Sequence, residues 1–193
     1  RVVSQDMLRT TFNANYWYLG NEQFDGSGYQ MADGGIALLP YGSSDLELSV
    51  QTAPFTDGYF DATSLKSYFY SYLSNNKTTR EELVLALSGL AQLDEPVLTQ
   101  LQSVASIADL TPRERLYVAL GLAHLGDTER ARSIYTALLT QYGEDLAPVY
   151  RLKLGKDDDA NTQATALAAV VGVLLQDEHA KGLWQYVQDR PTT

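Results

Sequence analysis

Two histidines are the first candidates for chemistry at neutral pH, because an imidazole can serve as a general base or a metal ligand. His124 and His179 are the only histidines among the 193 residues. Neither has a second histidine at the short spacing that pairs of metal ligands usually have. We expect His124 to be packed or half-buried on a helix, and His179 to lie in the first turn of a helix and face water.

The acidic run Asp157–Asn161 is the most suggestive polar feature. Its D-x-D-x-N spacing is that of the start of a calcium-binding loop. However, Thr162 stands where that loop requires glycine, and Ala168 stands where it requires a bidentate glutamate. The run also resembles the aspartate-rich motif of toroidal terpene cyclases. The simplest interpretation is a solvated loop whose carboxylates favour the positive end of the following helix.

Acidic and aromatic side chains could also form a carbohydrate site. Two facing carboxylates can hydrolyse a glycosidic bond, but with 24 acidic residues some pair always fits. Aromatic residues at helical spacing more often pack in a core than line a sugar groove; the candidates are Tyr16, Trp17, Tyr68, Tyr70 and Tyr72. The sequence has no H-E-x-x-H, phosphate-binding loop, G-x-S-x-G or dinucleotide motif. We therefore predict no enzyme activity and no catalytic, cofactor-binding or metal-binding residues.

Charge and composition limit the partners. The net charge of −10 and the pI of about 4.5 disfavour binding to nucleic acids and to anionic membranes. There is no cysteine, so these residues can form no disulfide and no thiolate metal site. No apolar run reaches the length needed to cross a bilayer, so we expect no membrane insertion by this segment. Because the chain begins with Arg1, we expect it to be a piece of a longer protein.

The elements that would hold these residues are mostly helices. We expect a single helical domain over residues 1–193, irregular over residues 1–60 and built of helical hairpins over residues 61–193. Glycine and tyrosine are frequent in the first part, where Asp33-Gly34-Gly35 and Pro40-Tyr41-Gly42 predict turns. The predicted helices span about 4–12, 46–53, 61–74, 79–93, 96–105, 111–125, 127–143, 161–175 and 177–190. We assign no clear element to residues 146–154.

Helix boundaries rest on local capping signals. Thr79 with Glu82, and Thr111 with Glu114, have the spacing of capping boxes. Three similar segments also recur, each with Ala and Asp eight positions apart and a small residue between: Ala86–Asp94, Ala119–Asp127 and Ala169–Asp177. The small residue allows two helices to approach closely, and we expect the aspartate to cap the next helix. This pattern predicts helix–turn–helix units packed side by side at uneven spacing.

Four segments, in the same order, resemble motifs of the helical thioester domain of alpha-2-macroglobulins, including the bacterial alpha-2-macroglobulin-like proteins. Tyr29–Ile36 resembles the "YQ…DGGF" turn, and Ser44–Ser49 resembles the helix start that follows it. Thr162–Ala168 resembles an "E-x-TALAL" helix start, and Gly182–Arg190 resembles a "WL…QR" helix. The resemblance covers roughly residues 29–193. It implies an all-α fold of antiparallel helical hairpins in an α/α toroid or partial toroid.

The resemblance also implies a function. It suggests a non-catalytic domain of a bacterial surface, extracellular or periplasmic protein that takes part in protease trapping or host interaction, with proteases or host proteins as partners. Domains of this family normally carry a Cys-Gly-Glu-Gln thioester motif. Gly20-Asn21-Glu22-Gln23 matches only its end, by chance, and has no thiol. Either the motif lies upstream of Arg1, or the protein belongs to members that lack a thioester.

Two other functions stay open. Gly126, Ala131 and Tyr135 have the spacing of a tetratricopeptide repeat, although no neighbouring unit repeats it. A scaffold of that kind would be elongated and would bind a peptide in a concave groove. A toroidal enzyme acting on a sugar or isoprenoid would instead have a deep acidic and aromatic cavity, and would lose activity on changes to Asp157 or Asp159.

Overall fold

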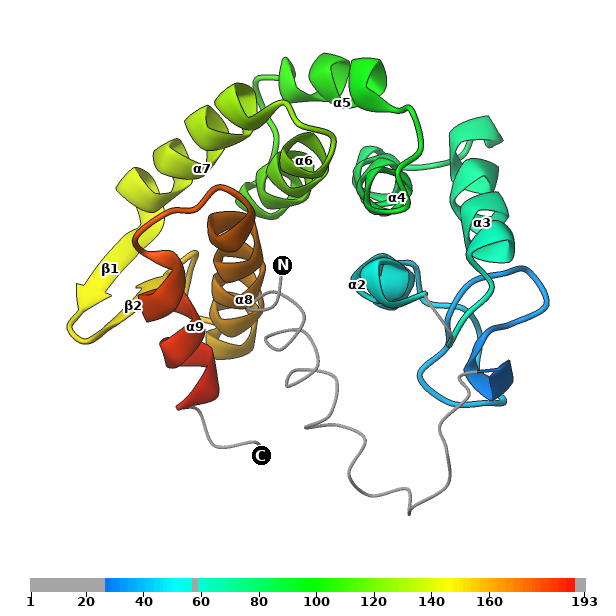
Figure 1. The fold of residues 1–193 in the computed structure, drawn as a ribbon, viewed down its shortest axis with the longest axis horizontal. Coiled ribbons are helices and arrows are strands. Elements are labelled where there is room, and N and C mark those ends of the chain that lie inside the picture. Colours follow the sequence, from blue (N-terminus) through cyan, green and yellow to red (C-terminus); the bar gives the residue numbers. More distant parts are fainter. Residues whose placement is uncertain (1–26, 57–58, 190–193) are drawn as a thin grey trace. The chain divides into compact units, whose positions relative to one another are not determined.

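The computed structural model describes residues 27–56 and 59–189, which form two compact units, one within Asp25–Thr140 and one containing Gln141–Thr193. The described residues are mostly helical, as the sequence predicts (Figure 1). The expected helix at residues 4–12 and the candidate residues Tyr16 and Trp17 lie outside the described residues. The assignment of both units to one domain stays a prediction.

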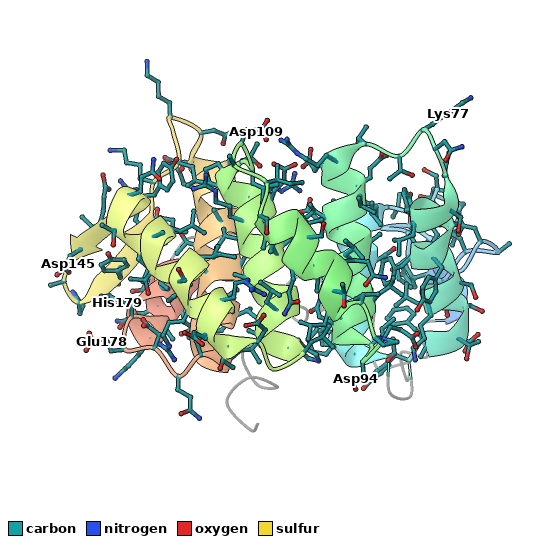
Figure 2. The ribbon with its side chains drawn as sticks, turned by 90° about the horizontal axis from the view of Figure 1, so that it is seen from above. Lys77, Asp94, Asp109, Asp145, Glu178 and His179 are labelled. Atoms are coloured by element: carbon teal, nitrogen blue, oxygen red, sulfur yellow. The ribbon has the colours of Figure 1, made fainter. Side chains whose placement is uncertain are left out.

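The larger unit is a row of helices covered on one side by others. In Figure 1, α2, α4 and α6 lie side by side, while α3 and α5 pack along the outside of this row. Figure 2 shows Lys77 and Asp109, which precede α4 and α6, at the same end, and Asp94, which follows α4, at the opposite end. The helices α4 and α6 are therefore parallel. The elements are η1 Ser27–Tyr29, α2 Leu46–Thr52, η2 Ala53–Phe55, α3 Ala62–Ser74, α4 Arg80–Gln92, α5 Leu98–Ala105, α6 Pro112–His124 and α7 Thr128–Tyr142.

Side-chain caps begin the principal helices of this unit, as predicted. Asp45 accepts a hydrogen bond from the Leu48 amide at the start of α2, and Asp61 accepts bonds from the first turn of α3. Thr79 and Thr111 each form a complete capping box, at the starts of α4 and α6. These bonds satisfy backbone amides that have no partner within the helix, so the boundaries follow from local sequence.

Glycines allow the helices to approach closely in the core. A Cβ atom on Gly89 of α4 would lie 2.6 Å from the Cε2 and Cζ atoms of Phe69 on α3. A Cβ atom on Gly121 of α6 would lie 2.9 Å from Leu101 Cδ1 on α5. This confirms for two of the repeats that the small residue serves close packing. The fully buried large side chains of the unit are Ile36, Leu65, Phe69, Leu87, Leu90, Leu101, Leu116, Leu122, Tyr135 and Leu138.

The three repeats end their helices in the same way. In each, a left-handed residue follows the helix, and the next amide donates to a carbonyl five positions earlier, which is a Schellman motif. These bonds run from Glu95 to Leu90, from Asp127 to Leu122 and from Asp177 to Gly172, at 3.0, 2.9 and 2.8 Å. The left-handed residues are Asp94, Gly126 and Gln176, with φ of 59°, 88° and 55°.

The expected capping role of the repeat aspartates is correct only at Asp127, because the N-cap of α9 is His179 and that helix has no side-chain cap. Asp127 accepts a 3.3 Å bond from the Arg130 amide, and Asp177 accepts a 3.0 Å bond from the His179 amide. Asp94 is exposed and itself occupies the left-handed position, while the N-cap of α5 is Val97, which provides no side-chain cap. In the first repeat the aspartate is itself the left-handed residue, whereas in the other two repeats the aspartate follows the left-handed residue by one position.

The smaller unit contains a β-hairpin that the sequence analysis did not predict. Strands β1 Gly143–Leu146 and β2 Val149–Leu152 pair antiparallel, with Glu144 opposite Arg151. Two helices follow, α8 Asp158–Leu174 and α9 Ala180–Gln188. Both pack on β2 and on each other (Figure 1).

The helix α8 begins earlier than predicted. Its N-cap is Asp157, which accepts bonds from the Asp159 and Ala160 amides, so Asn161 is already inside the helix. Asn161 is buried, and its side chain bonds the backbone of Leu154 and Gly155, which closes the loop between β2 and α8. Asn161, which was predicted to begin the helix, therefore holds the preceding loop against the helix.

On α9 the buried side chains are Ala180, Leu183 and Tyr186. Trp184 and Val187, predicted on the buried face, are only half-buried.

Candidate functional site

The turn predicted at Asp33-Gly34-Gly35 is held by several side-chain hydrogen bonds, and we treat it as the candidate site. The Asp33 carboxylate accepts a 3.0 Å bond from the Gly35 amide and a 2.6 Å bond from the Ser44 hydroxyl. Gln30 uses both ends of its side-chain amide. Its Nε2 donates to the carbonyls of Gly34 and Asp61, and its Oε1 accepts from the Asp61 amide at 2.8 Å. The turn is thereby tied to the starts of α2 and α3.

Close packing leaves no room for a side chain at either of the two glycines in this turn. Gly34 has φ of 91°, and a Cβ atom there would lie 2.1 Å from the backbone oxygen of Ser64. A Cβ atom on Gly35 would lie 2.7 Å from the ring of Tyr68. The Tyr68 and Tyr72 hydroxyls form a 3.0 Å hydrogen bond. Burial and this bond raise the pKa of Tyr68, so the phenol stays protonated and cannot serve as a base.

A second polar cluster joins α2, α4 and α6. Arg113 pairs with Glu47 and with Glu81, the latter at 2.6 Å. Tyr117 donates a 2.7 Å bond to Glu47. Burial, together with the neighbouring Glu47 charge, raises the pKa of Tyr117. Arg113 lies between the two carboxylates, so they do not form the unpaired acid and base that glycoside hydrolysis requires.

A third cluster connects the starts of α4 and α6. Arg80 binds Glu114 through two nitrogens, Nε at 2.8 Å and Nη2 at 3.2 Å, and its Nη1 lies 3.0 Å from Asp109 Oδ1. Glu114 also closes the capping box of α6, and its side chain is only 4% exposed. Burial raises the pKa of Glu114, but the bonds from Arg80 and Thr111 outweigh it, so the net pKa is lowered.

Replacing Glu114 by glutamine tests this cluster. We expect the free energy of unfolding at pH 7 to fall by about 1–2 kcal/mol, because a buried charge-assisted contact is weakened. A carboxylate with a lowered folded pKa stabilises the fold above its unfolded pKa, and this contribution is lost as pH falls through the folded value. The difference between the two proteins should therefore shrink below about pH 4. Urea unfolding at several pH values measures it.

The control for that experiment is Glu81→Gln, which alters an exposed glutamate that also pairs with an arginine. We expect it to change stability little, because exposed ion pairs contribute little. A difference between Glu114→Gln and the unmodified chain that stays constant down to pH 2 would contradict the assigned role of the Glu114 charge.

The two histidines lie apart from these clusters. His124, in the last turn of α6, is half-buried as predicted, with Asp94 at 3.9 Å, and burial lowers its pKa. His179 is the residue before α9, and the expectation that it faces water is only partly correct. Its ring lies 4.7 Å from the Tyr150 ring, and its Nδ1 lies 2.9 Å from Asp177. Its role here is packing against the hairpin.

The acidic run Asp157–Asn161 is the start of α8 and not the solvated loop that the simplest interpretation predicts, although its carboxylates do lie at the positive end of the helix. Asp157 caps α8, Asp158 and Asp159 lie in its first turn, and Asn161 points into the loop that precedes it. The described residues contain no group of three or more His, Cys, Asp or Glu side chains arranged to hold a metal ion. Among the candidate aromatics that the structure describes, Tyr68 is buried whereas Tyr70 is exposed and bonds Glu95, so these two do not line one groove.

The sequence analysis missed the polar residues that connect one helix to another. The contacts of Gln30, Arg80 and Arg113 could not be predicted, because their partners on other helices lie about 30 or more positions away along the chain. The Gly20–Gln23 segment lies outside the described residues.

Within the part of the chain that the structure describes, no helix combines the length and apolarity needed to cross a bilayer. No protein-family model, curated protein or solved structure matches the chain.

Proposed function

We propose that this chain is a non-catalytic domain of a bacterial surface or periplasmic alpha-2-macroglobulin-like protein, and that it takes part in protease trapping or host interaction. Its helical hairpins would form an α/α toroid or a partial toroid. The domain would act as a binding and conformational element rather than as a catalyst.

The observation that carries this proposal is that segments resembling family motifs contact each other in pairs. Ile36 accepts a 2.8 Å bond from the Asp45 amide, and its own amide donates to the Ser49 hydroxyl at 2.8 Å. Together with the Asp33–Ser44 bond, these contacts join the Tyr29–Ile36 turn to the Ser44–Ser49 helix start.

The second pair of segments behaves in the same way. Thr165, within the first of them, accepts a 3.0 Å bond from the Leu152 amide of β2. Gly182, which begins the other, lies against Tyr150 of the same strand. The helices that carry them, α8 and α9, also pack directly on each other. The second pair of segments is therefore joined through β2 and through the packing of α8 on α9.

The test is a trapping experiment on the full-length protein that contains this domain. Incubation with trypsin should change the mobility of the protein in a native gel. The bound trypsin should retain activity on a small peptide substrate but lose activity on a large protein substrate. Trypsin blocked at its active-site serine is the control, because it cannot cleave and should cause no change. The proposal fails if active trypsin causes no change, or if macroglobulin-type β-domains do not flank this segment in the full-length protein.

A further inference from the structure

We propose that the loop Leu38–Tyr41 is a docking site for a partner protein whose binding segment combines apolar and basic side chains. This inference does not rest on the proposed function, because it depends only on the exposure and the charge of the loop.

The loop exposes a continuous apolar sequence. Leu38 is 70% exposed and Tyr41 is 84% exposed, and Leu39 and Pro40 between them are exposed as well. The other large exposed apolar side chains of the described residues are scattered along the chain, at Tyr59, Tyr70, Ile107 and Leu146. Single exposed apolar residues are common on protein surfaces, whereas a contiguous set indicates an interaction site.

The base of the loop is firmly held, so this exposure is built into the fold. Ile36 and Ala37, just before the loop, are buried, and the Ala37 amide donates to the Tyr29 carbonyl at 2.9 Å. The bond between Asp45 and Ile36 closes the loop on its other side, and the Gly42 amide donates to the Leu39 carbonyl at 2.9 Å. A preformed loop loses little conformational freedom on binding.

Negative charge at the base of the loop determines the chemistry of the partner. No lysine or arginine occurs between Arg9 and Lys66 in the sequence. Asp33 and Asp45 flank the loop and are exposed, and among the described residues they accept hydrogen bonds only from neutral amides and a hydroxyl. Two copies of this surface would repel each other, as would an anionic membrane. A basic and apolar segment complements it.

Binding to a synthetic amphipathic peptide of leucine and lysine tests the proposal. We expect saturable binding by fluorescence anisotropy, with amide chemical-shift changes concentrated in residues 33–45. Leu38→Ser/Tyr41→Ser should weaken the affinity by about tenfold. Ile107→Ser/Leu146→Ser, which changes two exposed apolar side chains elsewhere, 37% and 45% exposed, should change it by less than about twofold. A peptide with glutamate in place of lysine should not bind.

A second pair of variants isolates the charge. Asp33→Asn/Asp45→Asn keeps an oxygen acceptor at both positions but removes both charges, so it should reduce the salt dependence of binding. Equal affinity of the Leu38→Ser/Tyr41→Ser variant would overturn the proposal, because it would indicate general attraction to an acidic protein. Concentration-dependent dimerisation through this loop in analytical ultracentrifugation would also overturn it, in favour of a second copy of the chain.

Discussion

Replacing Gly34 by alanine is expected to destabilise the larger unit by about 3 kcal/mol or more, and in the extreme to prevent its folding. Two effects add at this position. The positive φ of Gly34 disfavours any residue with a Cβ atom, at a cost of about 1–2 kcal/mol. The new atom would also meet the backbone oxygen of Ser64 at 2.1 Å, and backbone in the first turn of a helix cannot easily move away. Urea unfolding followed by circular dichroism measures the loss.

Two other glycines separate these effects. Gly126 has φ of 88° but open space around it, so Gly126→Ala should show the conformational cost alone, about 1 kcal/mol. Gly155 has neither a positive φ nor a close neighbour, so Gly155→Ala should be close to neutral. If Gly34→Ala proved no more destabilising than Gly126→Ala, the close contact between the turn and α3 would be wrong.

Replacing Gly89 by alanine should also destabilise the fold, although alanine is the better helix former by about 1 kcal/mol. The new Cβ would lie 2.6 Å from the Phe69 ring, which is fully buried. Such overpacking typically costs about 1–3 kcal/mol. Phe69→Leu alone should destabilise by leaving a cavity, but it should also make room for the alanine. The loss of stability in the double variant Gly89→Ala/Phe69→Leu should therefore be smaller, by about 1 kcal/mol, than the sum of the losses in the two single variants.

Ser88→Ala is the matched control for these single and double variants, since it changes the neighbouring buried position on the same helix. The Ser88 hydroxyl has no hydrogen-bond partner among the described residues, so its removal should be neutral or stabilising. Strict additivity of Gly89→Ala and Phe69→Leu would indicate that the two residues are not in contact.

Helix starts could be predicted from the sequence where the signal is local. Thr79 and Glu82 need only each other to form a capping box, and so do Thr111 and Glu114. The start of α8 depends on more than local sequence. Asp157 and Asn161 are both good caps, and which of them begins the helix depends on the loop that the Asn161 side chain closes. The predicted start of this helix was wrong because the loop is a tertiary contact, which the local sequence does not reveal.

The β-hairpin was missed for a similar reason. Its strands have four residues each, too short to give a clear alternation of apolar and polar residues. The hairpin is stabilised by cross-strand pairs, such as Glu144 with Arg151, and by α8 and α9, which pack on β2. Within the candidate site, the sequence predicted the Asp33–Gly35 turn but not its connection to Asp61 through Gln30, which spans 31 positions.

The shared helix ends have a consequence for how further copies of the repeat should be recognised. By backbone conformation and hydrogen bonding, Asp94 is equivalent to Gly126 and Gln176, so an alignment that matches the three aspartates places the first unit one residue out of register. Neither glycine nor aspartate is invariant at the matching positions, whereas the backbone bond across five residues is common to all three. A sequence profile for finding related units should therefore align them on the two residues joined by this hydrogen bond. At the position just before the donor residue, the profile should allow any residue that tolerates a left-handed conformation.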